Sequence, residues 1–286
     1  MFHYVTSNFK YHHFDKNQFE IIVKQLAETK QIISLKQLKE MQNKMEKIDD
    51  DCIMLTFDDG TVDHYKYVYP ILKKYNVHGL FFICSNVIKR EILDIQYIHQ
   101  ILSKSHVNEI YLQVQQFIEK NNLSICFEEK FCKETDNWKE SYIKQLLQTI
   151  LPEKYRKELL EKLIKKYKIS TDFNDYYMTI DNILEMKSNG MEFGCHTNSH
   201  KRLSYLNENE QINEIKENMQ LLYKYNVLDE NNVVSIAYPF GNYNNTTIKI
   251  LDELNFEFAF TTREENVCKG KLEIGRFDCN VLRGSL

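Results

Sequence analysis

Apolar and polar residues follow two patterns along this chain, one typical of strands and the other of helices. Short apolar runs bounded by turn residues predict strands at 52–57, 78–83, 191–196, 233–238 and 256–262. Between these runs, apolar residues recur at helical spacing, as they do in 19–30 and 210–225. Strands that alternate with helices predict an α/β fold with a largely parallel sheet or a barrel.

Residues 88–178 do not follow this alternation. The segment 140–169 carries two amphipathic helical patterns, one before Pro152 and one after it. We therefore expect a helical insertion at 88–178 within a single domain that spans 1–286. With 286 residues, of which 43% are hydrophobic, the chain is long enough to bury a substantial core.

Charge and composition argue against several classes of protein. The chain has 37 Lys and Arg against 41 Asp and Glu, a formal net charge of −4, so no overall positive field points to a nucleic acid partner. The N-terminal residues lack the apolar core of a signal peptide, and no later run reaches the roughly 18 apolar residues of a transmembrane helix. We expect a cytoplasmic protein without a transmembrane segment.

Two pairs of polar residues follow predicted strands. Asp58 and Asp59 come directly after 52–57, and the carboxyl ends of strands are where parallel α/β folds gather functional groups, although Asp-Gly is also common in surface turns. His196 and His200 stand four residues apart, a spacing that lets two imidazoles meet one metal when the segment turns helically but that also arises by chance. Together the two pairs supply the mixed nitrogen and oxygen ligands of a catalytic zinc-type site.

Two other kinds of hydrolytic site fit the residues less well. Phosphatases with a D-x-D-G-T motif need a residue between the acids so that both lie on one side of an extended strand, whereas Asp58 and Asp59 are adjacent. Metalloproteases with H-E-x-x-H need a Glu where this chain has Thr197. A general base must therefore come from elsewhere, and one of the two aspartates is the obvious source.

Three motifs in order resemble a known family. The segments "TFDDG" (56–60), "HTNSH" (196–200) and "AYPFGNYN" (237–244) are similar to the motifs of polysaccharide deacetylases of the NodB-homology type, also called carbohydrate esterase family 4. The similarity covers roughly 1–87 and 178–280. It implies a deformed (β/α)7 barrel and the metal-dependent hydrolysis of an N-acyl group from an amino sugar.

The resemblance also implies roles for individual residues. Asp58 matches the catalytic base, while Asp59, His196 and His200 match the three ligands of a divalent metal, for which zinc is expected. Such an ion would polarise the acyl carbonyl and lower the pKa of its bound water. Asp58 would then take the proton of that water.

The third motif implies an oxyanion site in the turn that begins with Tyr238 and Pro239. A backbone N–H, expected at Phe240, would stabilise the negative charge of the tetrahedral intermediate together with the metal. The alternative is that Phe240 is simply a packing aromatic.

Two departures from the family pattern concern charge and the general acid. Family members with the fuller third motif carry an Arg where this chain has Ala237. Arg276 could supply that charge from another segment and orient Asp58, or it could instead form an ion pair with Asp278.

The family's last motif should bring a histidine that protonates the leaving amine, but His200 is the last histidine of the chain. Some relatives carry the equivalent histidine on the first strand, and "MFHYV" resembles that arrangement. His3 is therefore the implied general acid, with His12 and His13 as rivals.

The insertion carries a basic helix that bears on the substrate. Residues 152–169 hold a net charge of +4, which fits a solvated face or a contact with an anionic group, such as a nucleotide- or lipid-linked sugar or a membrane surface. We expect a cytoplasmic sugar N-deacylase that acts on a glycan precursor. Two alternatives remain, a non-sugar amide or cyclic-imide hydrolase on the same barrel and a catalytically silent carbohydrate-binding homologue.

Overall fold

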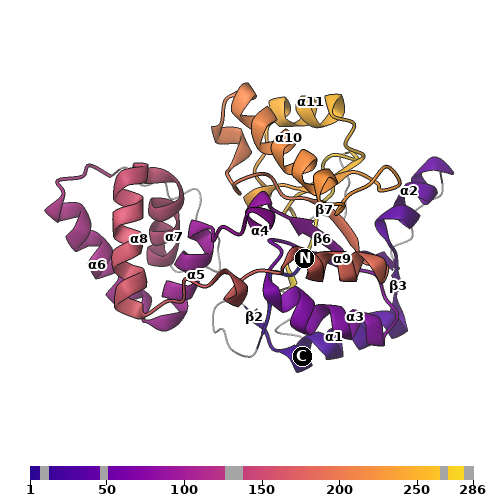
Figure 1. The fold of residues 1–286 in the computed structure, drawn as a ribbon, viewed down its shortest axis with the longest axis horizontal. Helices are drawn as coiled ribbons and strands as arrows, with labels where there is room; N and C mark the ends of the chain where they lie inside the picture. The colour runs from indigo at the N-terminus through magenta and orange to yellow at the C-terminus, as the bar shows by residue number, and fades with distance from the viewer. Residues whose placement is uncertain (7–12, 46–50, 126–137, 265–269, 280–286) are drawn as a thin grey trace. The chain divides into compact units, whose positions relative to one another are not determined.

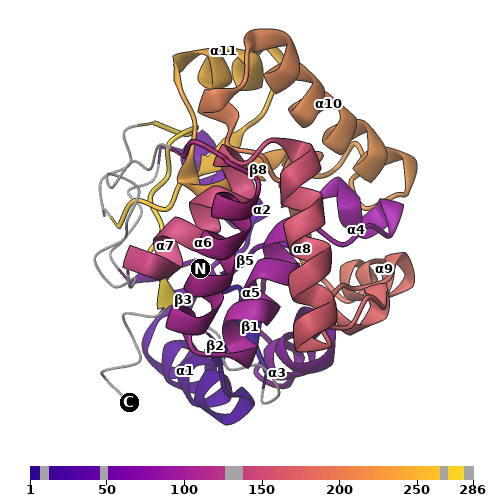
Figure 2. The ribbon, with the colours of Figure 1, turned by 90° about the vertical axis from the view of Figure 1, so that its left-hand side faces the viewer.

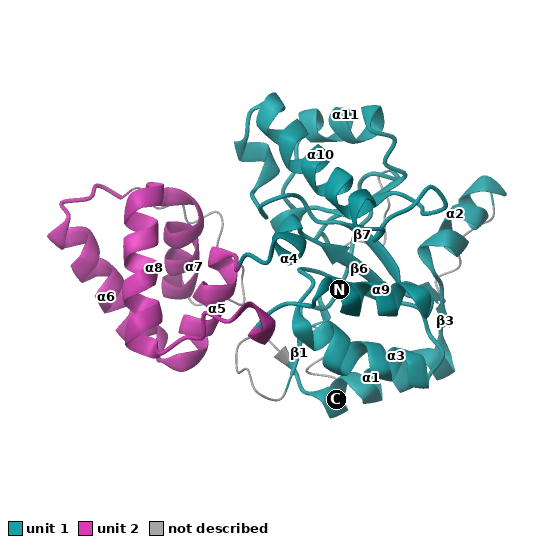
Figure 3. Cartoon of the chain, in the orientation of Figure 1, with its two compact units in different colours: residues 1–7, 12–91, 176–286 teal, residues 8–11, 92–175 magenta. Residues whose placement is uncertain are grey.

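The computed structural model describes residues 1–6, 13–45, 51–125, 138–264 and 270–279. It divides the chain into two compact units, drawn in different colours in Figure 3. The first comprises residues 1–7, 12–91 and 176–286, and the second comprises residues 8–11 and 92–175. That the two units belong to one domain with an insertion stays a prediction.

A curled parallel sheet is the centre of the first unit (Figure 1). Within the described residues, its strands lie side by side in chain order: β5 (Thr56–Phe57), β6 (Leu80–Ile83), β7 (Glu192–Cys195), β8 (Ser235–Ala237) and β9 (Phe258–Phe260). Each neighbouring pair is parallel. Parallel strands that follow chain order and are joined by helices are wound as in a barrel, and this sheet forms half of one.

Four shorter strands from the N-terminal part of the chain form two separate two-stranded sheets. β1 (Tyr4–Val5) pairs with β2 (His13–Phe14), and β3 (Gln31–Ile32) pairs with β4 (Cys52–Ile53), both in parallel. Phe2 makes a parallel bridge to Phe57, which places the start of the chain beside β5. The run 52–57, predicted as one strand, is in fact β4 and β5, which belong to different sheets.

Helices connect the strands of the first unit. They are α1 (Lys16–Thr29), α2 (Leu35–Asn43), η1 (His64–Val68) with α3 (Tyr69–Lys74), α4 (Ser85–Lys89), α9 (Ile180–Ser188), α10 (Glu208–Lys224) and α11 (Asn245–Glu253). A capping box starts several of them, because a short polar side chain before the helix accepts from the third helical N–H. These N-caps are Asp15, Ser34, Thr179, Asn207 and Asn244.

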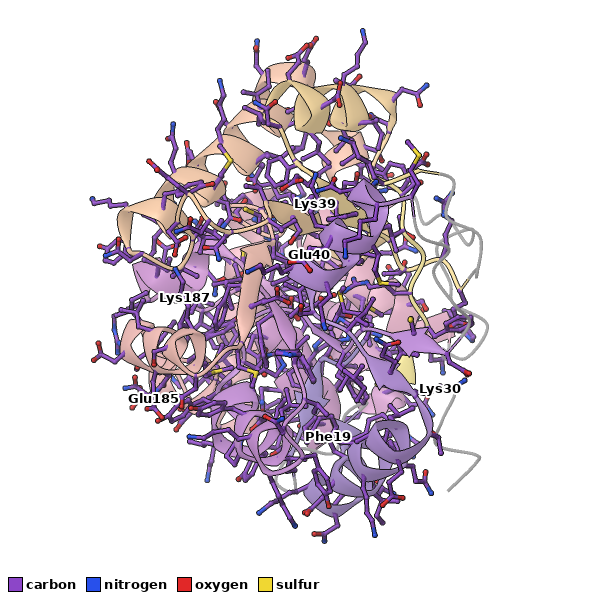
Figure 4. All side chains as sticks on the ribbon, turned by 90° about the vertical axis from the view of Figure 1, so that its right-hand side faces the viewer. Phe19, Lys30, Lys39, Glu40, Glu185 and Lys187 are labelled. Atoms are coloured by element: carbon purple, nitrogen blue, oxygen red, sulfur yellow. The ribbon has the colours of Figure 1, made fainter. Side chains whose placement is uncertain are left out.

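Aromatic side chains fill the core next to the N-terminal strands. The ring of Phe57 stacks on Phe81 at 4.7 Å and on Phe2 at 5.5 Å. Phe19 of α1, labelled in Figure 4, is fully buried against the same group. This packing holds β5, and the residues that follow it, in a rigid setting.

The second unit is helical (Figure 2). It contains α5 (Asp94–Lys104), α6 (Val107–Lys120), α7 (Trp138–Gln145) continued by η3 (Leu146–Ile150), α8 (Glu153–Tyr167) and the short η4 (Phe173–Asp175). The predicted helices on either side of Pro152 are confirmed, with Leu146 and Leu159 among the buried residues. Among the described residues of the chain, no helix has the length and apolar character that crossing a membrane requires.

Candidate active site

Asp59, His196 and His200 form a cluster of potential metal ligands in the first unit. Nε2 of His196 and Nε2 of His200 each lie 3.2 Å from Oδ1 of Asp59. One ligand atom from each residue lies within 4.8 Å of the others, and all three side chains are almost completely buried. The fold thus brings together the residues that follow β5 and β7, as the sequence predicts.

Contacts beyond the cluster orient His196. Its Nδ1 lies 2.8 Å from the carbonyl oxygen of Ala237; a carbonyl can only accept, so Nδ1 carries a proton, and in the neutral imidazole this leaves the lone pair on Nε2. Its backbone N–H donates to Oδ1 of Asn218 at 3.0 Å. The amide nitrogen of Asn218 donates to the carbonyl of Ile83 and to the hydroxyl of Ser85. One side chain of α10 therefore ties the ends of β6 and β7 together.

His200 lies on a turn rather than on the helical turn that its spacing suggested. The backbone N–H of His200 donates to the hydroxyl oxygen of Thr197 at 3.2 Å. Glu214 of α10 fixes the turn, since its carboxylate accepts from both the backbone N–H and the hydroxyl of Ser199. The segment 196–200 contains no helix, so this turn brings the two imidazoles together.

Four residues in and around the cluster have a backbone conformation that is unusual for residues other than glycine. Non-glycine residues adopt positive φ at Asp59 (75°), Thr197 (66°), His200 (56°) and Phe240 (59°). Such conformations are uncommon, above all for a β-branched residue such as Thr197, and each costs roughly 1–3 kcal/mol. The packing of the fold sustains this strain, as it often does at functional sites.

The cluster fits a divalent metal. Oδ1 of Asp59 is buried, and no described residue donates a well-formed hydrogen bond to it, although the two imidazoles lie nearby. Burial alone would raise the pKa of Asp59, but His200 and His196 outweigh burial and hold that pKa well below its usual value. An ionised carboxylate with two imidazole nitrogens is a three-ligand set typical of catalytic zinc.

Arg276 binds Asp58 with both ends of its guanidinium group. Nη1 and Nη2 each donate to a different carboxylate oxygen at 2.8 Å, and Nε donates to the carbonyl of Thr261 at 3.0 Å. Burial would raise the pKa of Asp58, yet the Arg276 charge outweighs it and lowers that pKa below its ordinary value. Of the two partners considered for Arg276, the structure shows the ion pair with Asp58.

His3 also lies near the Asp58 carboxylate. Its Nε2 is 3.9 Å from Oδ2 of Asp58, and 37% of its side chain is exposed. His12 falls outside the described residues, and only the backbone of His13 is described, as part of β2. His3 is therefore the one of these three histidines whose side chain the structure describes, and it lies next to the predicted base.

The predicted oxyanion turn is adjacent to the cluster. The ring of Phe240 meets His200 edge-on with centroids 4.7 Å apart, and the Arg202 guanidinium lies 4.2 Å from the centroid of the Phe240 ring. Pro239 is buried, and the Tyr238 hydroxyl donates to the carbonyl of Leu272 at 2.8 Å. Tyr238 thus contributes to packing through both its ring and its hydroxyl.

Sequence reasoning missed the supporting residues of the site. Gln211, Glu214 and Asn218 are buried on α10, whereas the apolar pattern alone places the inner face of this helix on residues such as Ile215 and Leu222. Their helical spacing was visible in the sequence. A buried polar stripe, however, cannot be told from an exposed one by spacing alone.

Comparison with known sequences identifies relatives of this chain. A family model described as polysaccharide deacetylase matches residues 45–127 and 152–259. YxkH of Bacillus subtilis (strain 168), provisionally described as a polysaccharide deacetylase, is 35% identical over 69 residues. That match covers 24% of this chain and 25% of YxkH, so the chain spans about a quarter of this relative's length. His3 and Arg276 both lie outside the segments that the family model matches.

Solved structures share the fold. The deacetylase PplD of Streptococcus pyogenes, solved in complex with acetate, has a TM-score of 0.60 at 20% identity, over 96% of this chain and 88% of that chain. IcaB from Ammonifex degensii has a TM-score of 0.59 at 16% identity, again over 96% and 88%. These similarities confirm the predicted fold class, an α/β fold with a deformed barrel of the NodB-homology type, in which the curled parallel sheet forms a half-barrel.

The family model matches more than half of the chain, and its two matched segments contain Asp58, Asp59, His196, His200 and the Tyr238–Phe240 turn. The chain therefore belongs to the polysaccharide deacetylase family, carbohydrate esterase family 4.

Proposed function

We propose that this protein is a metal-dependent hydrolase that removes an N-acyl group, in the simplest case acetyl, from an amino sugar of a glycan or glycan precursor. The observation that carries the proposal is the buried Asp59–His196–His200 cluster directly beside the Arg276-paired Asp58. Family membership supports a carbohydrate substrate, and the relative PplD is a deacetylase solved with acetate, the acid that removal of an acetyl group would release.

Asp59, His196 and His200 would hold the ion, with zinc as the expected metal. When bound, a divalent ion acts as a Lewis acid that polarises the acyl carbonyl and activates water. The Nδ1 hydrogen bond of His196 to Ala237 keeps Nε2 directed at the cluster. This orientation is what a second layer of contacts around a metal ligand normally achieves.

The protein side chains would carry the two proton transfers of the hydrolysis. Asp58 takes a proton from the water as the water oxygen bonds to the acyl carbon, and Arg276 keeps the carboxylate oriented. His3 gives a proton to the sugar nitrogen as the C–N bond breaks, which leaves a free carboxylic acid and an amino sugar. The backbone N–H of Phe240 would donate to the oxyanion, because a preorganised donor is most effective where charge develops.

The carrier of the sugar and the location of the reaction remain predictions. A nucleotide- or lipid-linked precursor and a peripheral membrane contact are supported by the charge pattern of 152–169, and a cytoplasmic location is proposed together with them. A non-sugar amide or cyclic-imide hydrolase would use the same groups, so profiling acetylated sugars against small amides and imides separates the two activities.

Metal content and acid release together test the proposal. The protein is stripped with a chelator, reloaded with zinc, and assayed for acetate released from N-acetylglucosamine oligomers. We expect about one metal equivalent, lost in His196→Ala and His200→Ala, and activity only in the loaded protein. His78→Ala, which removes an exposed histidine, is the matched control. Equal metal content and turnover in all three variants would contradict the proposal.

A further inference from the structure

His64 is a buried histidine that the proposed chemistry does not use. It is the first residue of η1, its side chain is completely buried, and its ring centroid lies 5.6 Å from that of Phe57 and 5.6 Å from that of Phe81. An apolar side chain would suit such surroundings better, since burying a polar ring costs free energy unless its nitrogen atoms are satisfied. A histidine here therefore calls for a specific contact.

That contact is a hydrogen bond to the backbone of His3. Nε2 of His64 lies 3.0 Å from the carbonyl oxygen of His3, so Nε2 carries the proton and donates. Nδ1 of His64 is buried without a hydrogen-bond partner among the described residues. Burial lowers the pKa of His64 to about 4, so the ring is neutral and keeps one tautomer near neutral pH.

Other contacts from the segment after β5 hold the same part of the chain. The Thr61 hydroxyl also donates to the His3 carbonyl, at 3.4 Å. The preceding residue, Phe2, is held on both sides of its peptide. Its N–H donates to the carbonyl of Thr56, and the carbonyl of Phe2 accepts from the N–H of Asp58. β1 is two residues long and pairs with an equally short β2, so these contacts supply much of the support for His3.

We propose that His64 is a positioning residue that, by donating its Nε2 proton to the His3 carbonyl, holds the His3 imidazole beside Asp58. The role of His3 in protonating the leaving amine rests on the proposed function. The placement of His3 is independent of the proposed function, because it follows from the contacts of η1 and β5 with the first residues of the chain.

Three substitutions of His64 separate the donated hydrogen bond from simple packing. His64→Gln keeps an amide donor near the position of Nε2, whereas His64→Met has similar length without a donor, and His64→Phe keeps aromatic volume without one. In the zinc-loaded protein, we expect His64→Met and His64→Phe to lower kcat about 10- to 100-fold with little change in KM or metal content, as misplacement of a proton donor should. His64→Gln should recover most of the loss. In a His3→Ala background, His64→Phe should have no further effect on kcat.

The placement is measured independently of activity by NMR in the metal-free protein. The His3 ring should be ordered in the wild type and in His64→Gln, and mobile on the picosecond to nanosecond timescale in His64→Met. Unchanged order in His64→Met, or equal losses of kcat in His64→Gln and His64→Met, would overturn the proposal. If the wild type released no acid from any substrate, the proposed function would fail, while the NMR comparison would still decide the role of His64.

Discussion

Arg276 and Asp58 lie 218 positions apart in the sequence, and the Arg276 guanidinium binds both carboxylate oxygens of Asp58 at 2.8 Å. Both side chains are buried, with 5% and 3% of their surfaces exposed. A buried charge pair of this kind is valuable for its geometry, since the planar guanidinium matches the carboxylate and fixes its plane. The pair sets the direction of the proposed base relative to the proposed metal ligands, the first of which is the next residue, Asp59.

Replacing Arg276 by lysine should separate charge from geometry. The new side chain in Arg276→Lys would keep a positive charge but lose the two parallel hydrogen bonds, and the Asp58 carboxylate could then rotate. We expect kcat to fall about 100-fold, the scale of a small misplacement of a catalytic group, with the metal retained. Steady-state kinetics with metal analysis measure both effects. Wild-type kcat in this variant would show that orientation by the guanidinium is not required.

Removing the charge of Asp58 should abolish proton abstraction. Asp58→Asn cannot take a proton from water, so kcat/KM should fall by about 10²–10⁴-fold, the usual range for general acid–base groups. Metal content should stay at the wild-type level, because Asp59 and the two histidines are unchanged. Asp252→Asn, at an exposed acid of α11, is the control. Comparable turnover in the two variants would refute the assignment of the base.

Asn218 should govern how tightly the cluster binds metal. Asn218→Leu removes the hydrogen bonds that Asn218 makes with the N–H of His196, the carbonyl of Ile83 and the hydroxyl of Ser85. The N–H of His196 keeps its bond to the carbonyl of Ile83, so the free energy of unfolding should fall by about 1–3 kcal/mol. Zinc affinity should drop about 10- to 100-fold as His196 loses its support. Competition with a zinc chelator and urea denaturation measure these changes. The control Asn213→Leu, at an exposed position of the same helix, should change neither the zinc affinity nor the free energy of unfolding. Equal zinc affinity in the two variants would argue against a role of Asn218 in metal binding.

Asp63 should make stability depend on pH. Burial raises the pKa of Asp63 to about 7. The charge of Lys66 and a hydrogen bond from Thr6 act in the opposite direction but do not outweigh burial. An unfolded Asp titrates near 4, so between about pH 4 and pH 7 the folded chain binds a proton that the unfolded chain has released, and the contribution of Asp63 to stability declines as pH rises.

Asp63→Asn, which resembles the protonated acid, should therefore gain about 1–2 kcal/mol of stability over the wild type at pH 8 and much less at pH 5. Urea denaturation at the two pH values measures the difference. A gain that is the same at both pH values would mean that the carboxyl group does not titrate in this window.

Much of the fold was predictable because it depends on short-range pattern. Apolar runs of strand length alternate with helical spacing, and such alternation leads to parallel strands joined by helices. The break between β4 and β5 was not predictable. "CIMLTF" is one continuous run, and only the curl of the sheet decides that Cys52 and Ile53 pair with β3 while Thr56 and Phe57 pair with β6.

The four central residues of the site were predictable for a similar reason. Asp58, Asp59, His196 and His200 lie at or just after strand ends, and parallel strands bring those ends to the same edge of the sheet. Their motifs, in order, also indicated the family. The geometry of the turn at 196–200 differed from the expected helical turn, because positive φ values at Thr197 and His200 depend on anchoring by α10.

The sequence by itself determined the order of strands and helices, the family and the identity of the groups that lie at the strand ends. Only the tertiary structure decided which distant residues support them. Three contacts join segments that are separated in the chain: the ion pair of Arg276 with Asp58, the hydrogen bond of His64 to His3 and the hydrogen bond of His196 to Asn218. Periodicity reports on neighbours within one element, whereas these contacts arise from the way the curled sheet brings separate elements together.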